Sequence, residues 1–122
     1  MDFLIVGLGG FIGAIMRYTL YLVERALGVT AFPWGTLAIN LIGCFGAGML
    51  FALAERMVPV QRPWLLFGAM GIIGSFTTFS AFSVESLQLF RSGHAGMALA
   101  NISANVVLGL ALVWGGHWVI QA

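Results

Sequence analysis

GIIGSFTTFSAFSVE, residues 71–85, is the stretch that decides how this chain folds. It lies within an apolar run that has the length of a membrane-spanning helix. Yet it contains glycines and the β-branched pair Thr77 and Thr78, and these residues weaken a helix. A break between Gly74 and Phe79 is one interpretation of this pattern. The other is a continuous helix whose Ser and Thr hydroxyls bond back to their own backbone, and the residues alone leave both open.

The composition predicts that the whole chain lies in a membrane. Of its 122 residues, 61% are hydrophobic and only 7% are charged, whereas a soluble domain carries about 25% charged residues. So few charges cannot cover the surface of a soluble fold. The net charge of +1 provides no basic face for nucleic acid. We expect an integral membrane protein that does not bind nucleic acid.

Four apolar runs are long enough to cross the membrane as helices. They cover residues 3–22, 33–54, 63–84 with a continuation to residue 90, and 95–120. Prolines and charged residues gather in the links between the runs, and no link is long enough for a further domain. The sequence therefore predicts one all-α domain, residues 1–122, with four transmembrane helices.

The arginines are nearly balanced between the two sides of the membrane. Arg56 and Arg62 flank the second loop, whereas Arg25 and Arg91 belong to the first and third loops on the opposite side. Because orientation follows the count of Lys and Arg in short loops, this balance predicts insertion both ways round. Chains of both orientations could form antiparallel dimers. The alternative is that other signals fix one orientation.

Polar side chains recur inside the apolar runs at helical spacing. Asn40 lies one turn after Thr36 in the second run, and Asn101, Asn105 and Gly109 follow one another four apart in the fourth. A buried amide must find hydrogen-bond partners. Each stripe is therefore either a packing seam between helices or part of a permeation path, and the sequence leaves both open.

Further candidate residues surround the predicted break. If a new helix begins before Phe79, then Phe79, Phe82 and Ser83 share one face, and the electropositive edges of phenyl rings suit an anion. Arg17 is the only cation inside an apolar run, and it either marks a functional site or reaches the interface. Glu85 is expected near the far end of the third helix, bonded to hydroxyls or an Arg.

Other chemistries are excluded or disfavoured. His94 and His117 have no second ligand at metal-binding spacing, and no nucleophile–base set is present, so we expect no enzyme. The glycine-rich stretch at residues 7–13 does not fit a dinucleotide-binding motif. A small multidrug-type, proton-coupled exporter needs a carboxylate in the first run, where Arg17 stands instead. A non-conducting subunit of a membrane complex is the other alternative.

Three segments resemble the signatures of the Fluc (CrcB-type) fluoride channels. They are GGFIGAIMRY at residues 9–18, GTLAINLIGCFGAG at 35–48 and the stretch at 71–85. The resemblance implies a channel that passes fluoride out of the cytoplasm and excludes chloride, in the bacterial inner membrane as a multi-pass protein. It also implies an antiparallel dual-topology dimer in contact with lipid, and leaves open whether the partner is identical or related.

The same resemblance assigns roles to individual residues. Phe79 and Phe82 match phenylalanines that line the fluoride path. Asn40 matches the asparagine that donates to the ion, with Thr36 one turn earlier. Arg17 matches an arginine near the aqueous vestibule.

Two positions are implied to hold a cation, and one position departs from the family pattern. The resemblance implies that the third helix is broken near its middle, and Gly74 and Thr77 match the positions in this break whose backbone carbonyls hold a structural sodium ion (Na+) at the dimer interface. Gly109 stands where relatives carry a serine in the fourth helix, and glycine has no side-chain donor; either Asn105 or a water substitutes for the serine, or conduction is altered. Ser83 and Asn105 complete the set expected along the fluoride path.

Overall fold

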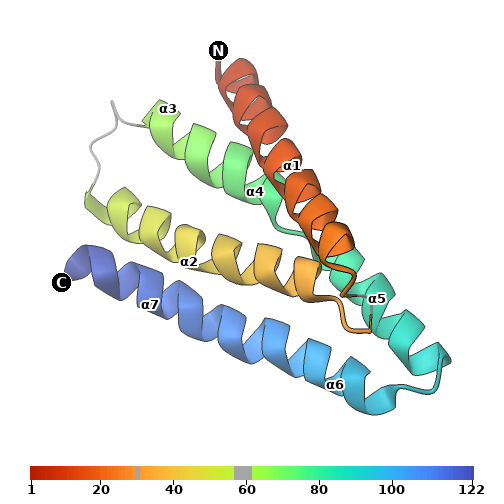
Figure 1. Ribbon diagram of the computed structural model, residues 1–122. Helices are drawn as coiled ribbons and strands as arrows, with labels where there is room; N and C mark the ends of the chain where they lie inside the picture. The colour runs from red at the N-terminus through yellow and green to blue at the C-terminus, as the bar shows by residue number, and fades with distance from the viewer. Residues whose placement is uncertain (30, 57–61) are drawn as a thin grey trace.

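Four long helices make up the protein (Figure 1). The computed structural model describes residues 1–29, 31–56 and 62–122, and all regular structure within them is helical. Each of the four helices is long and apolar enough to cross a membrane: Asp2–Leu27, Trp34–Arg56, Arg62–Arg91 and Ala95–Gln121. The expected all-α fold with four spans is confirmed.

The first helix, α1 (Asp2–Leu27), extends beyond the predicted end at residue 22. It stops at Gly28, whose φ of 67° lies in the left-handed region and whose N–H bonds to the Arg25 carbonyl. Hydropathy marks only the apolar part of a span. The last helical turn can therefore carry charged residues where it leaves the hydrocarbon layer.

The third span is interrupted, as predicted, and divides into four parts. These are α3 (Arg62–Leu65), η2 (Leu66–Ile73), α4 (Gly74–Phe76) and, after two extended residues, α5 (Phe79–Arg91). The fourth span comprises α6 (Ala95–Ser103), η3 (Ala104–Leu108) and α7 (Gly109–Gln121). Both η segments are π-helical, a local widening that the sequence did not predict and that is often found at functional sites.

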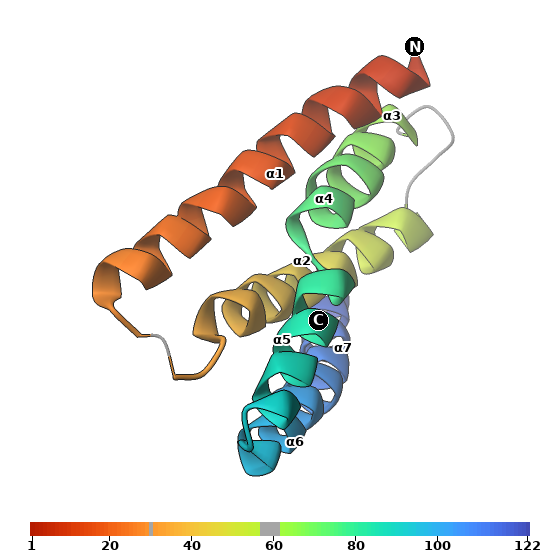
Figure 2. The same cartoon turned by 90° about the vertical axis from the view of Figure 1, so that its right-hand side faces the viewer.

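The break sends the two halves of the third span to different neighbours. α1 packs against η2 and α4, whereas α5 packs against α6. The second span, α2 (Trp34–Arg56), lies along α7. Figures 1 and 2 show α5 following α4 after a short extended connection and lying beside α6. The break therefore lies where these helix pairs meet.

Glycines allow the closest helix contacts. A Cβ atom on Gly9 of α1 would lie 2.9 Å from the Gly71 Cα in η2. One on Gly116 of α7 would collide with the Phe45 carbonyl and lie 3.1 Å from the Met49 amide nitrogen. Small residues let membrane helices approach at backbone distance, and this gives them packing where lipid offers no hydrophobic drive.

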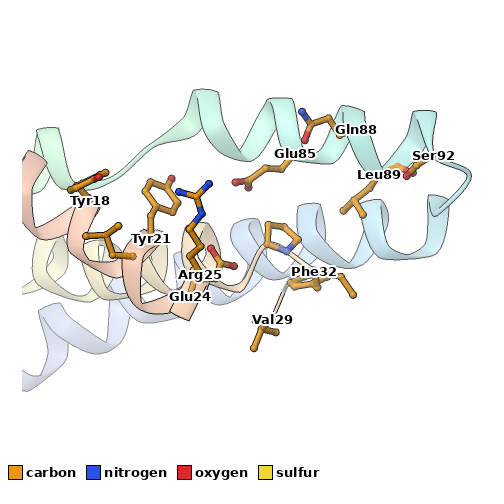
Figure 3. A pocket seen from close by; sticks show the side chains of 13 residues that line it. Tyr18, Tyr21, Glu24, Arg25, Val29, Phe32, Glu85, Gln88, Leu89 and Ser92 are labelled. Carbon is orange, nitrogen blue, oxygen red and sulfur yellow. The ribbon is translucent and has the colours of Figure 1, made fainter. Parts of the chain in front are cut away.

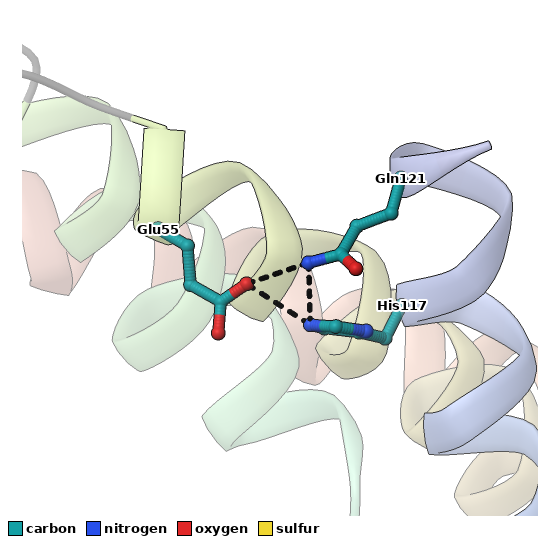
Figure 4. A network of polar contacts seen from close by, with 3 residues as sticks. All are labelled: Glu55, His117 and Gln121. Carbon is teal, nitrogen blue, oxygen red and sulfur yellow. Dashed lines mark hydrogen bonds and ion pairs between the residues drawn. The ribbon is translucent and has the colours of Figure 1, made fainter.

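A polar cluster joins the ends of α2 and α7 (Figure 4). The Glu55 Oε2 atom accepts a hydrogen bond from Gln121 Nε2 at 2.8 Å and lies 3.1 Å from His117 Nε2. Because Glu55 is an acceptor, His117 satisfies it by carrying its proton on Nε2. The cluster connects the two helices beyond the glycine contacts.

We predict that Gly116→Ala destabilises the fold and that its neighbour Gly115→Ala does not. The added methyl at position 116 has to push the Phe45 carbonyl away, which should cost about 1–3 kcal/mol. At position 115 nothing lies within 4 Å of the new Cβ. Thermal unfolding in detergent should give a lower Tm only for Gly116→Ala. Equal Tm values would contradict the α2–α7 packing.

Candidate functional site

The break consists of two extended residues in the middle of the third span. Thr77 has φ −73° and ψ 154°, and Thr78 has φ −148° and ψ 111°. The Thr78 hydroxyl then accepts a hydrogen bond from the Ala81 N–H at 3.2 Å and caps the new helix, α5. One threonine therefore both interrupts the span and restarts it.

Asn40 of α2 satisfies the backbone exposed by the break. The Thr78 N–H donates to Asn40 Oδ1 at 2.9 Å, and Asn40 Nδ2 donates to the Thr78 carbonyl at 3.2 Å. An unpaired peptide group within a bilayer costs on the order of several kcal/mol, so every such group must find a partner. Asn40 replaces the acceptor that the Thr78 N–H has lost and adds a donor to the Thr78 carbonyl, so it stabilises the break.

Two backbone carbonyls lose their usual helical donors. In a continuous helix the Thr78 N–H would bond to the Gly74 carbonyl, and the Ala81 N–H would bond to the Thr77 carbonyl. Here both N–H groups donate to side chains, to Asn40 Oδ1 and Thr78 Oγ1 respectively. The carbonyls of Gly74 and Thr77 are thereby released from these helical bonds.

A ladder of side chains continues from Asn40 into the fourth span. Asn40 Nδ2 donates to Asn105 Oδ1 at 2.8 Å. Asn105 Nδ2 donates to the Asn101 carbonyl at 2.9 Å and to Asn101 Oδ1 at 3.0 Å. Asn101 Nδ2 donates to Ser86 Oγ at 3.0 Å, and Ser86 Oγ donates to the Phe82 carbonyl at 2.8 Å. We call Asn40, Asn105, Asn101 and Ser86 the amide ladder.

A pocket of about 320 Å³ lies beside Asn40 and Asn105 of the amide ladder. Its rim includes the rings of Phe79 and Phe82, whose centroids are 5.4 Å apart at an interplanar angle of 58°. Phe82 is 8% exposed, whereas Phe79 is 79% exposed in the single chain. The residues lining it come from the second, third and fourth spans: Asn40, Gly43, Cys44, Ala47, Ile73, Thr77, Thr78, Phe79, Phe82, Asn105 and Val106. The structure thus brings five of the predicted site residues, Asn40, Thr77, Phe79, Phe82 and Asn105, to one cavity.

A larger pocket, about 530 Å³, lies between the end of α1 and α5 (Figure 3). Tyr21 and Arg25 of α1 line it together with Glu85 of α5, whose side chain extends from its helix toward them. Glu24 also lines this pocket, and its Oε1 accepts a hydrogen bond from the Gly35 N–H at 2.8 Å. That carboxylate satisfies a free N–H at the start of α2 and suits the positive end of the helix.

Thr36 joins three helices through its hydroxyl. It donates to Glu85 Oε1 at 2.6 Å, and the Tyr21 hydroxyl lies 3.2 Å away. Since a hydroxyl has a single hydrogen, which Glu85 receives, Tyr21 must be the donor to Thr36. The other carboxylate oxygen, Glu85 Oε2, is buried and has no hydrogen-bond partner among the described residues. Glu85 therefore bonds to a hydroxyl, as one of the expected alternatives.

The remaining predicted residues lie elsewhere. The Ser83 hydroxyl donates to the Phe79 carbonyl of its own helix at 2.9 Å. Arg17 is half-buried on α1, one turn before Tyr21, and neither it nor Ser83 lines either of the two pockets. Gly109 is buried, and a Cβ there would lie 3.3 Å from Cys44 Sγ.

Sequence reasoning missed part of the ladder. The spacing of Asn101 and Asn105 indicated a shared helix face, but it did not separate a packing seam from a polar track. Ser86 gave no signal, because its bond to Asn101 depends on α5 packing against α6. Tyr21 was missed because α1 was expected to end near it.

Comparison with known proteins gives a consistent result. The family model described as CrcB-like protein, Camphor Resistance (CrcB), matches residues 4–117. A protein of Leptospira interrogans named fluoride-specific ion channel FluC is 40% identical over 97% of this chain and 93% of its own length. Proteins with the same name are 38% identical in Koribacter versatilis and 42% identical in Idiomarina loihiensis.

Those two relatives are also matched almost in full. The alignment covers 99% of this chain and 96% of the Koribacter protein, and 93% of this chain and 88% of the Idiomarina protein. Relatives with this name are ion channels, which agrees with the expectation that the chain is not an enzyme. The chain belongs to the CrcB-like family of multi-pass membrane proteins.

Proposed function

We propose that this protein is a fluoride-selective ion channel that lets fluoride leave the cytoplasm passively and so protects the cell from fluoride toxicity. The relatives named as fluoride-specific channels support this function over nearly the whole chain. The observation that carries it is the pocket where Asn40, held by the helix break, and Asn105 meet the rings of Phe79 and Phe82.

The chemistry of this pocket suits a small anion. Fluoride is strongly hydrated, so a pore has to replace its water with other hydrogen-bond donors. The amides of Asn40 and Asn105 are such donors, and the edges of Phe79 and Phe82 are weakly positive. Within the described lining residues of this pocket there is no Arg, Lys or His. The ion is therefore bound without a fixed positive charge that would hold it too tightly.

The other predicted pathway residues have supporting roles in this proposal. Thr36 lies one turn before Asn40 and connects the pathway to Glu85 through a 2.6 Å hydrogen bond. Ser83 follows Phe82 on α5, and its hydroxyl becomes a donor to the anion when it leaves the Phe79 carbonyl, to which it donates at 2.9 Å in the structure. Arg17, one turn before Tyr21 of the larger pocket, attracts anions to the aqueous mouth.

We also propose a structural sodium ion at the break. The released carbonyls of Gly74 and Thr77 are hard oxygen ligands, which a hard cation prefers. Within the described residues no three His, Cys, Asp or Glu side chains gather where they could hold a metal. Backbone oxygens from two copies of the chain would together provide enough ligands. The match between these carbonyl oxygens and the ligands that sodium prefers supports the proposed site.

The functional unit is proposed to be an antiparallel dimer in the bacterial inner membrane, surrounded by lipid. Gly74, Phe79 and Ser80 are exposed beside the break in the single chain. Interrupted backbone does not face lipid, because lipid cannot satisfy it. A second copy, or a related subunit, covers this face. The balanced arginines support the antiparallel arrangement.

Fluoride efflux from liposomes tests the channel. We expect the purified protein to release fluoride rapidly, with chloride retained, as measured with ion-selective electrodes. Phe82→Ile should slow fluoride efflux by about tenfold, equivalent to about 1.4 kcal/mol in the barrier, because it removes a ring edge from the pocket. Phe90→Ile on the exposed side of α5 is the matched control and should conduct normally.

Three results would count against the proposal. Unchanged efflux in Phe82→Ile would remove the argument from the ring edges. No efflux from a folded wild-type protein would favour a non-conducting subunit, and co-expression with a related chain would separate that possibility from a missing partner. Proton-driven export of a cationic dye would instead favour the small multidrug-type exporter.

Replacing sodium with N-methylglucamine during purification should release the structural cation. We expect the dimer to dissociate or lose fluoride efflux, and both to recover when sodium is returned. The reason is that two carbonyls per chain would be left without a partner. Size-exclusion chromatography and efflux follow the two effects. Full activity after exhaustive removal of sodium would rule out this role.

A change in loop charge tests the dual orientation. His94→Lys with Gly96→Lys adds two positive charges to the third loop and should force one orientation. The lone variant is then expected to lose fluoride efflux, and co-expression with the wild-type chain should restore it. The pair His94→Gln and Gly96→Gln, at the same exposed positions, should remain active. Retained activity of the lysine variant alone would contradict the antiparallel dimer.

A further inference from the structure

The amide ladder has one defined hydrogen-bond direction. Asn40 is fixed by the Thr78 backbone, because its oxygen accepts from the N–H and its nitrogen donates to the carbonyl. Asn105 is fixed because its nitrogen faces the Asn101 carbonyl, which can only accept. Ser86 gives its hydrogen to the Phe82 carbonyl, so its oxygen must accept from Asn101 Nδ2.

This direction consumes the donors beside the pocket. Both hydrogens of Asn40 Nδ2 are used, by the Thr78 carbonyl and by Asn105 Oδ1. Both hydrogens of Asn105 Nδ2 are also used, by the carbonyl and the side-chain oxygen of Asn101. In this state Asn105 presents an acceptor to Asn40. An anion arriving between the two amides would meet that oxygen, which repels it.

We propose that Asn101 and Ser86 are positioning residues that control which end of the Asn105 amide faces the ion. This proposal rests on the proposed channel function. When an anion binds, the ladder reverses: Ser86 donates to Asn101 Oδ1, and Asn101 Nδ2 donates to Asn105 Oδ1. Asn105 Nδ2 then turns to the anion and donates one hydrogen bond to it, and Asn40 Nδ2 donates a second. Neither Asn101 nor Ser86 touches the ion.

The reversal is chemically balanced. It gives up the hydrogen bonds from Ser86 to the Phe82 carbonyl, from Asn105 to the Asn101 carbonyl and from Asn40 to Asn105. It gains two bonds to an anion, and charge-assisted bonds are roughly twice as strong as neutral ones. Asn101 is fully buried, so water cannot supply the hydrogen bonds that Asn101 gives to its neighbours. Ser86 is the group that permits reversal, because a hydroxyl can rotate from acceptor to donor.

The chain offers an unusually clean test, because it contains only three asparagines and they are the three amides of the ladder. Protein labelled with ¹⁵N only in asparagine gives three side-chain NH2 signals, which single substitutions assign. Titration with sodium fluoride should shift the Asn101 signals together with those of Asn40 and Asn105, although Asn101 does not line the pocket. Sodium chloride should shift none of them.

Substitutions at Ser86 separate positioning from packing. Ser86→Ala removes the rotating hydroxyl and should raise the half-saturating fluoride concentration for efflux by about tenfold, equivalent to about 1.4 kcal/mol. It should also leave the Asn101 signals unmoved by fluoride. Ser86→Thr keeps the hydroxyl and should restore both readouts. Ser103→Ala, at an exposed position in the same helix as Asn101, is the matched control.

Each result has a definite meaning. An Asn101 signal that stays still in the wild type while Asn40 shifts would overturn the proposal. So would a Ser86→Ala protein with a lower maximal efflux at an unchanged half-saturating concentration, because a packing defect produces that pattern. If Ser86→Ala does not fold, the proposal is still tested by the fluoride titration of the wild-type protein and by the two readouts of Ser86→Thr. Failure of the channel function itself is recognised separately, by absent wild-type efflux.

Discussion

The reciprocal pair between Asn40 and the Thr78 peptide is the interaction on which the structure depends. A membrane span cannot be interrupted unless another group satisfies the exposed backbone. Asn40 does so with one donor and one acceptor of matching geometry, and the Thr78 hydroxyl restarts the helix. Beyond the break α5 packs against α6, while α4 packs against α1.

The break also provides two kinds of binding group, hydrogen-bond donors and carbonyl oxygens. Its side-chain partner Asn40 connects it to the amide ladder and to a pocket bounded by Phe79 and Phe82. In its backbone, the carbonyls of Gly74 and Thr77 lose their helical donors. One irregularity in the backbone therefore supports both an anion path and, in our proposal, the cation that joins two chains. Hydrogen-bond donors suit the first and oxygen ligands suit the second.

The fourth span shows how this chain departs from the pattern that its resemblance implied. Gly109 stands where the resemblance implies a serine, and a Cβ there would meet Cys44 Sγ at 3.3 Å. The polar side chains at this level are Asn105, one turn earlier, which bonds to Asn40, and behind it Asn101. An amide differs from a hydroxyl because it cannot rotate a hydrogen from one side to the other. Its direction has to be set by neighbours, which is why Ser86 becomes important.

The sequence by itself determined four spans and the residue types of the site, because hydropathy acts locally. Glycine and threonine indicated where the third helix could break, and the family resemblance implied that it does. It also indicated that Asn101 and Asn105 share a face. Only the tertiary structure decided which partners these amides have, because Asn40 meets Thr78 and Asn101 meets Ser86 across different helices. The π-helical segments and the longer α1 likewise depend on packing and on helix ends, which hydropathy does not record.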